Sequence, residues 1–300
     1  MAGIEGGRVL ITGASGGIGA EVAKRMAERG ARLALSGRRA ERLAAVATEI
    51  ESHAGTRPEA LTADLGKPGE AARLAAAAED ALGGVDVLIN NAGANLQGLT
   101  WVAGDGGEAR EVFETNFWSP MALVAAVTPP MLERGSGTIV NVGSMIHVSP
   151  FPHLGHTAAS KAALAAATQV LRLELGRRGV AVVEIALGPV DTATSRENRA
   201  LAGADRWLDG RPGLGRVAGA AAAIVAAAER GADGIAFYPH VLRWVHRLPG
   251  LGRRYARRMA ADADIADRSV RLGGSAGNAE LRALREDWDS SARNRVSSPG

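Results

Sequence analysis

Glycine residues cluster directly after the first apolar run, between positions 12 and 19. The stretch reads Thr12-Gly13-Ala14-Ser15-Gly16-Gly17-Ile18-Gly19, a Gly-x3-Gly-x-Gly spacing where a strand would pass into a helix. Glycine there lets the backbone approach a pyrophosphate, and the free N–H groups of the helix start attract negative charge. The pattern differs from the Gly-x-Gly-x-x-Gly dinucleotide fingerprint, so alone it is also compatible with a plain tight turn.

The second apolar run ends in Gly37-Arg38-Arg39, where an NAD site would place an acid against the ribose 2′-hydroxyl. No acid is present there, and two guanidiniums suit a 2′-phosphate because each presents a fork of N–H donors. The simpler alternative is a pair of solvated loop arginines. With the glycine turn upstream, the pair favours NADP(H) over NAD(H) as the cofactor.

The amino-acid composition excludes several kinds of chemistry. With no cysteine in 300 residues, a disulfide, a thiolate nucleophile and a cysteine-based metal site are excluded, and we expect no metal. Only three of the 35 basic residues are lysines, and the only tyrosines are Tyr238 and Tyr255. A lysine or tyrosine at a chemically meaningful position is therefore informative.

The excess of basic residues is confined to one segment. Residues 240–260 contain six arginines and no acid, whereas residues 1–239 carry 23 basic and 25 acidic residues. A nearly neutral body with one basic segment does not have a nucleic-acid-binding profile, so we expect no nucleic-acid partner. The first residues lack the features of a secretory signal, and no apolar run has the length of a transmembrane helix. We therefore expect a cytoplasmic protein.

Apolar runs alternate with helical stretches from residue 8 to residue 238, as in βαβ units around a parallel sheet. The candidate strands are Val9–Thr12, Arg32–Ser36, Val85–Ile89, Thr138–Val142, Val180–Ala186 and Gly234–Tyr238. The candidate helices are Gly17–Arg29, Ala40–Ser52, Gly69–Leu82, Glu108–Arg134, Thr157–Gly176 and Val217–Arg230. This order predicts one doubly wound α/β domain of the Rossmann type over residues 1–239, with a C-terminal helical extension.

The C-terminal part has a different pattern. Residues 240–260 predict a basic amphipathic helical arm, broken near Pro249-Gly250. The arm could rest on an anionic membrane surface, cover a cleft, pack on a neighbouring subunit, or simply pack on its own domain. Residues 261–300 form a polar tail that we expect to be partly disordered. Residues 193–216 predict either a substrate lid or a solvated loop.

These motifs, taken in order, resemble the short-chain dehydrogenase/reductase family from about residue 7 to residue 239. Asp64-Leu65 is similar to the family's adenine-contacting pair, Asn90-Asn91-Ala92-Gly93 to its NNAG motif, and Gly188-Pro189-Val190-Asp191-Thr192 to its loop over the nicotinamide. The resemblance implies that NADP(H) is bound by Gly13, Ser15, Gly17, Ile18, Gly19, Arg38, Arg39, Asp64, Leu65, Asn91, Ala92, Gly93, Lys161, Gly188, Val190 and Thr192.

The same resemblance implies a reaction centre and exposes a departure from it. Ser144 matches the family's catalytic serine, Asn116 its helix asparagine, and Lys161 the lysine of its Tyr-x-x-x-Lys pair. Thr157 occupies the position of the tyrosine that donates the proton. An aliphatic hydroxyl is a much weaker acid than a phenol, whose pKa near ~10 a neighbouring ammonium can lower.

The missing acid leaves three sources for the proton. His153, four residues before Thr157, or His147, three residues after Ser144, could donate it. A water relayed through Ser144 or Thr157 is a second source. A phenol on the substrate, hydrogen-bonded to the ketone, is the third, and we favour it because it needs only hydride and positioning from the protein.

We therefore expect an NADPH-dependent ketoreductase that acts on a bulky, aromatic polyketide-like ketone, with substrate-assisted or water-relayed protonation. The alternative is an NADP(H)-binding protein without redox chemistry, either a cyclase, isomerase or dehydratase or an inactive partner subunit. The resemblance also implies a homodimer or homotetramer, formed through the helices at residues 108–134 and 157–176.

Overall fold

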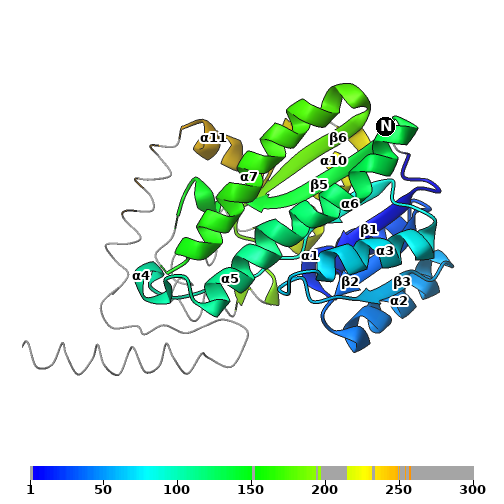
Figure 1. Cartoon of the computed structure of the whole chain (residues 1–300), viewed down its shortest axis with the longest axis horizontal. Coiled ribbons are helices and arrows are strands. Elements are labelled where there is room, and N and C mark those ends of the chain that lie inside the picture. The colour runs from blue at the N-terminus through cyan, green and yellow to red at the C-terminus, as the bar shows by residue number, and fades with distance from the viewer. Residues whose placement is uncertain are drawn as a thin grey trace, which may run out of the picture.

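Seven parallel strands form one sheet in the order β3-β2-β1-β4-β5-β6-β7 (Figure 1). The computed structural model describes residues 3–150, 153–193, 195–196, 215–231, 234–248, 250, 254 and 257. The strands are β1 (Arg8–Thr12), β2 (Arg32–Gly37), β3 (Glu59–Thr62), β4 (Val87–Asn90), β5 (Gly137–Ser144), β6 (Val180–Leu187) and β7 (Gly234–Tyr238). The order reverses between β1 and β4, which confirms the predicted doubly wound fold.

Helices cover both faces of the sheet (Figure 1). One face carries α1 (Gly17–Ala27), α2 (Ala40–Ala54) and α10 (Val217–Arg230), and the other carries α3 (Glu70–Leu82), α6 (Ser119–Arg134) and α7 (Gly155–Leu175). The short elements are α4 (Thr100–Ala103), α5 (Gly107–Phe113), η1 (Glu114–Trp118), η2 (Met145–His147), η3 (Gly176–Arg178) and α11 (Leu242–Arg247).

The central strands are apolar on both faces because both faces are covered. In β1, Val9 and Ile11 pack into the core beneath α1 and α10, whereas Leu10 packs into the core beneath α3 and α6. All three side chains are fully buried. Continuous apolar runs of this kind are typical of strands in a parallel sheet.

Besides the short elements, a strand and a long helix differ from the sequence prediction. Strand β3 was not predicted: it is mostly exposed and pairs only with β2 at the sheet edge, so it lacks the apolar signal of the central strands. The predicted continuous helix over residues 108–134 is three pieces, α5, the π-helical turn η1 and α6. Asn116 lies in that π turn, a feature that occurs often at functional sites.

Much of the predicted lid and C-terminal region lies outside the described residues. Residues 197–214, most of the lid, and 258–300, which include the polar tail, are not among them. Helix α11 lies at the start of the predicted basic arm, and it ends at Arg247, two residues before Pro249.

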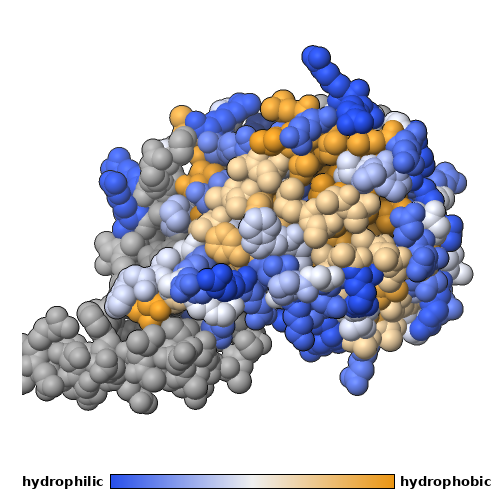
Figure 2. Space-filling model, viewed as in Figure 1, coloured by the Kyte–Doolittle hydropathy of each residue, from blue (hydrophilic) through white to orange (hydrophobic). Residues whose placement is uncertain are grey.

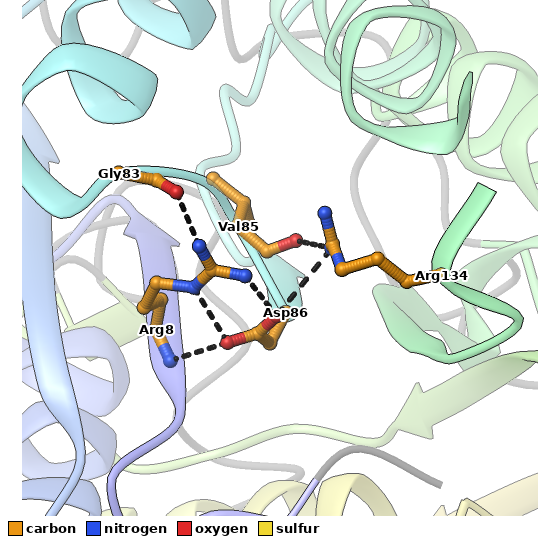
Figure 3. A network of polar contacts seen from close by, with 5 residues as sticks. All are labelled: Arg8, Gly83, Val85, Asp86 and Arg134. Carbon is orange, nitrogen blue, oxygen red and sulfur yellow. Dashed lines mark hydrogen bonds and ion pairs between the residues drawn. The ribbon is translucent and has the colours of Figure 1, made fainter. Parts of the chain in front are cut away.

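A charged network ties β1 to the segment before β4 at the amino edge of the sheet, opposite the edge where the glycine turn lies (Figure 3). Asp86 accepts hydrogen bonds from the backbone N–H of Arg8 at 3.0 Å and from its guanidinium at 2.8 and 2.6 Å. Arg134 approaches the same carboxylate at 3.4 Å. The Arg8 guanidinium holds the pKa of Asp86 below its ordinary value.

Replacing Asp86 with alanine is expected to lower the free energy of unfolding by about 1–3 kcal/mol, because it leaves the partly buried Arg8 without its charged partner. The contribution is present above the unfolded aspartate pKa of about 3.9 and is lost as the pH falls through the lower folded pKa. Thermal and urea unfolding as a function of pH measure it. Asp105→Ala is the control, because Asp105 and Arg110 form an exposed ion pair. Equal destabilisation by both variants would contradict this role for Asp86.

Candidate active site

The residues singled out from the sequence meet at the carboxyl edge of the sheet. The glycine turn follows β1, the arginine pair follows β2, the Asn-Asn-Ala-Gly motif ends β4, Ser144 ends β5, and the Gly188 to Thr192 loop follows β6. Ligands of doubly wound sheets bind in the crevice at this edge, beside the strands where the order reverses. Strands β1 and β4 are those two strands here.

The glycine turn is closely packed against the end of β4. Gly13 has a φ of 67°, and a Cβ there would lie 2.9 Å from the Cα of Ala92. A Cβ on Gly19 would lie 2.6 Å from the Nδ2 atom of Asn91. The side chain of Thr12 accepts the N–H groups of Asn91 and Ala92, both at 3.0 Å. Only glycine fits at these two positions. The backbone of the turn can therefore approach a ligand more closely than it could if side chains were present there.

The first turn of α1 faces the loop that follows β6. Gly17 has a φ of 56° and begins α1, and a Cβ there would lie 3.9 Å from the methyl group of Thr192. No acidic residue occupies the first turn of α1. The turn therefore offers free N–H groups and a positive helix end, which suit a pyrophosphate.

The arginine pair lies beside the segment that follows β3. Ser15 packs on Gly37, where a Cβ would lie 3.1 Å from its hydroxyl oxygen. The N–H of Ala63 donates to the carbonyl of Gly37 at 3.2 Å, which brings Asp64-Leu65 next to Arg38. Arg38 and Arg39 are both exposed. The two guanidiniums are exposed at the carboxyl edge of the sheet, where a phosphate could reach them.

Glu111 was not predicted, although it contacts this region. Its carboxylate lies 3.7 Å from the Arg38 guanidinium, and a Cβ on Gly66 would lie 2.7 Å from its Cγ. The pair is exposed, so its strength is low and a phosphate could displace the carboxylate. Sequence spacing could not place Glu111 here because it lies far from Arg38 in the chain.

Asn116 organises the loop that leaves β4. It is fully buried; its Oδ1 accepts the N–H of Ala94 at 2.9 Å, and its Nδ2 donates to the carbonyl of Ala94 at 2.9 Å and the hydroxyl of Ser160 at 3.0 Å. A Cβ on Gly93 would lie 3.6 Å from the same Oδ1. Asn116 thereby fixes the backbone beside Gly93 and couples it to α7.

Lys161 projects from α7 to the ends of β4 and β5. Its Nζ donates to the carbonyl of Val142 at 2.9 Å, and a Cβ on Gly93 would lie 3.8 Å from the same nitrogen. Burial lowers the pKa of Lys161 to about 8, and the negative charge of Glu184 opposes that shift. The ammonium therefore lies at the carboxyl edge of the sheet, and its pKa is about 8.

Glu184 is a buried acid that the motifs did not reveal. It lies in β6 at 2% exposure, and burial raises its pKa while Arg172 and Lys161 oppose the shift. A Cβ on Gly143 would lie 2.9 Å from its Oε1, so its carboxylate covers that glycine. The signal was visible as a single acid within the apolar run of β6. Glu184 places negative charge on the same side of the sheet as Lys161.

Ser144 and Thr157 are the two hydroxyl residues that the motifs predicted at the reaction centre. The Oγ of Ser144 accepts the N–H of Ile146 at 3.2 Å at the end of β5. Thr157 lies one turn before Lys161 on α7, is 3% exposed, and its Oγ1 accepts the N–H of Leu96 at 3.1 Å. The threonine oxygen therefore anchors the loop that follows β4.

The candidate histidines lie in different environments. Burial lowers the pKa of His153 and of His147, so both carry less charge at neutral pH than an exposed histidine. His153 has a left-handed backbone, with φ 66°, and its carbonyl accepts the N–H of Gly98 at 2.8 Å. The Nε2 of His156 lies 2.6 Å from the carbonyl of Gly104, which directs it toward α4.

Tyr238 is engaged in packing at the end of β7. Its hydroxyl oxygen accepts the N–H of Arg216 at 3.0 Å, and a Cβ on Gly215 would lie 2.5 Å from its ring. The contact holds the start of α10 against the sheet. Tyr255, the other tyrosine, lies outside the described residues.

Comparison with known proteins identifies the family. A model of the short chain dehydrogenase family matches residues 8–202. The chain belongs to this family. The predicted family resemblance is confirmed, and the match covers the glycine turn, Ser144, Thr157 and Lys161.

Two related proteins match the chain over different lengths. Nodulation protein G of Rhizobium sp. (strain N33) is 34% identical over 190 residues, which cover 63% of this chain and 76% of the relative. A fatty acyl-CoA reductase of Mycobacterium tuberculosis is 32% identical over 256 residues, which cover 84% of this chain and 83% of the relative.

Solved structures of the short-chain dehydrogenase fold align over most of the chain. The short-chain dehydrogenase from Sphingobium yanoikuyae, solved in complex with NADPH, is 31% identical with a TM-score of 0.69, over 89% of this chain and 98% of that one. The bulky-bulky ketone specific alcohol dehydrogenase from Comamonas testosteroni is 26% identical with a TM-score of 0.68, over 89% and 96%.

Proposed function

We propose that the protein is an NADPH-dependent ketoreductase that reduces a bulky, hydroxyaromatic ketone of the polyketide type. The observation that carries the proposal is the partly buried ammonium of Lys161, held at 2.9 Å from the Val142 carbonyl and next to Gly93, which follows the residues packed on the glycine turn. The NADPH complex of one related structure and the bulky ketone named for another support this cofactor and substrate class.

The crevice suits NADPH at each of its parts. The turn from Gly13 to Gly19 and the start of α1 would hold the pyrophosphate. Arg38 and Arg39 would bind the 2′-phosphate, and the neighbouring Asp64-Leu65 pair would contact the adenine. Further along the edge, Asn91-Ala92-Gly93, Lys161 and the loop with Gly188, Val190 and Thr192 would hold the nicotinamide ribose and ring.

NADPH held by these residues would supply the hydride for the carbonyl carbon of the ketone. Ser144 orients the carbonyl oxygen by donating its hydroxyl proton in a hydrogen bond. Lys161 binds the ribose hydroxyls and places positive charge near the oxygen as it becomes an alkoxide. A proton from the substrate's own phenol then neutralises the alkoxide, and the phenolate regains a proton from water.

The side chains around Lys161 favour this proton source. We propose that Thr157 occupies the family's tyrosine position, and its oxygen already accepts the Leu96 N–H. Burial lowers the pKa of His153 and of His147, so each carries less imidazolium at neutral pH than an exposed histidine would. A water hydrogen-bonded to Ser144 is the second candidate for the proton donor, because that hydroxyl lies at the carboxyl end of β5.

The assay that tests the proposal follows absorbance at 340 nm and product mass with NADPH and a panel of hydroxyaryl ketones. We expect turnover that persists in His153→Ala and in Thr157→Ala. Thr157→Ala also removes the acceptor of a buried N–H, so its unfolding temperature is measured alongside. Tight NADPH binding without reduction of any ketone would instead favour a non-redox role, as a cyclase, isomerase, dehydratase or partner subunit.

We propose in addition that the protein forms a homodimer or homotetramer through α6 and α7. The outward side of α7 carries Val170 and Leu173, which are 52% and 82% exposed, and α6 presents alanines on its exposed side. Pale orange apolar surface covers this face of the molecule in Figure 2. Small side chains allow two helices to approach closely, which favours a second copy as the occupant.

Leu173→Arg is expected to shift the protein toward the monomer, because it places a charge at the centre of the proposed contact. Light scattering after size exclusion measures the mass. Gln169→Arg adds the same charge one turn away on α7 and serves as a comparison, with a smaller expected shift. An unchanged mass in Leu173→Arg would contradict an interface at this face.

A further inference from the structure

Helix α11 is attached to the domain by one of its sides. A Cβ on Gly188 would meet the side chain of Leu242, and the ring of His246 stacks edge-on against Phe237 with centroids 5.1 Å apart. Leu242 and His246 are one turn apart, so they define the inward side of the helix. The outward side is free of the sheet.

The outward side is apolar. Val241, Trp244 and Leu248 are 55%, 51% and 53% exposed, although large apolar side chains are usually buried. Val241 directly precedes α11, Trp244 lies within it and Leu248 directly follows it, so the three form one short apolar stripe at a spacing of three and four residues. This stripe, called here the α11 stripe, is an unpartnered apolar surface within the described part of the chain.

Arginines flank the α11 stripe. The guanidiniums of Arg243 and Arg247 lie 5.2 and 5.7 Å from the ring centre of Trp244. Arg254 and Arg257, further along the arm, are exposed as well. Residues 240–260 contain no acid, so the positive charge around the stripe is not neutralised within the arm.

We propose that the α11 stripe and its arginines dock the protein on an anionic phospholipid surface. A tryptophan between arginines, with aliphatic side chains on the same stripe, fits the interface between lipid headgroups and acyl chains. Uncompensated arginines complement the negative surface of such a membrane. Within the described residues, no helix has both the length and the apolar character of a membrane span.

Helix α11 lies beside the loop that follows β6, where Leu242 packs on Gly188. Burial lowers the pKa of His147, three residues after Ser144, and the charge of His246 adds to that shift. A docked protein would therefore face the bilayer near its carbonyl-binding end. This consequence rests on the proposed reductase function, whereas docking itself does not.

Flotation of the full chain with vesicles tests the docking. We expect binding to vesicles of phosphatidylcholine mixed with phosphatidylglycerol, weakening as salt is added. Arg243→Glu with Arg247→Glu should weaken it by at least about 30-fold, since each arginine near an anionic surface contributes roughly fivefold. Arg177→Glu with Arg178→Glu is the matched control, because both are exposed at η3, at the opposite edge of the sheet, and change the net charge equally.

A second variant separates the apolar part from the charge. Trp244→Ser with Leu248→Ser should weaken binding without altering net charge, while thermal unfolding and NADPH binding show that the fold is retained. Absence of vesicle binding by the unmodified protein, equal losses in the control, or undiminished binding in both arm variants would overturn the proposal. A change of oligomeric mass in the arm variants without vesicles would assign the stripe to a second copy and overturn it too.

Discussion

Replacing Lys161 with methionine is expected to lower kcat/KM for ketone reduction by roughly 10²–10⁴-fold. The reason is the placement of Nζ, which is partly buried and held 2.9 Å from the Val142 carbonyl, next to Gly93. Methionine keeps the length of the side chain and removes its charge and its donors. Weaker NADPH binding, measured by cofactor fluorescence, should accompany the loss because the ribose contact goes with the ammonium.

Lys24→Met is the matched control, because Lys24 lies on α1 and pairs with Glu49 away from the crevice. We expect its kinetics to stay within about twofold of the unmodified protein, as for a surface substitution. Equal activity of both variants would contradict the role assigned to Lys161. A loss explained by unfolding would appear as a lowered thermal transition in Lys161→Met.

The pH dependence of kcat/KM is a second test of the role of Lys161. With a pKa of about 8, the Lys161 ammonium loses its proton as the pH rises through that value, so kcat/KM should fall on the alkaline side. Glu184→Gln removes the negative charge that opposes the shift, so the falling limb should move to lower pH. A structural role for Glu184 alone would lower stability and leave the limb in place.

The combined variant Arg38→Asp and Arg39→Ala is expected to raise the Kd for NADPH by roughly 10²-fold or more while leaving that for NADH nearly unchanged. The 2′-phosphate would lose two charge-assisted donors and meet a carboxylate in their place. Isothermal titration with both cofactors measures the difference. The nicotinamide and pyrophosphate contacts are common to the two cofactors, so the ratio isolates the phosphate.

Arg177→Asp with Arg178→Ala carries the same change of net charge at η3 and controls for long-range electrostatics. Glu111→Gln should act in the opposite direction, with a few-fold tighter NADPH binding, because it frees Arg38 from its carboxylate partner. An unchanged NADPH affinity in the Arg38 and Arg39 variant would remove the basis for the 2′-phosphate assignment.

The sequence predicted those parts of the fold that depend on residues close together in the chain. The glycines between Gly13 and Gly19 and the apolar run before them marked the strand-turn-helix unit, because both features depend on neighbouring residues. Strand β3 escaped prediction because its residues are exposed at the sheet edge, where only pairing with β2 makes them a strand. The π turn at Asn116 depends on side-chain bonds to Ala94 and Ser160, and spacing cannot show those.

The sequence predicted which residues lie at the carboxyl edge of the sheet, but it did not predict the charges around them. The motifs brought Ser144, Asn116 and Lys161 to one edge, as expected for the ends of neighbouring strands and the helices that follow them. The charge of Glu184 near Lys161 and the Leu96 amide on Thr157 arise from the register of β5 with β6 and from a loop contact. Such contacts join residues that are distant in the chain, so the amino-acid sequence alone does not reveal them.

The most direct test of the account compares a hydroxyaryl ketone with its methyl ether, using NADPH deuterated at the transferred position. The account predicts deuterium at the new carbinol carbon of the phenolic substrate and a rate at least about 10²-fold lower for the ether, which lacks the internal proton donor. Equal rates for the two ketones would contradict substrate-assisted protonation, and absence of deuterium from the product of the phenolic ketone would contradict the reductase itself.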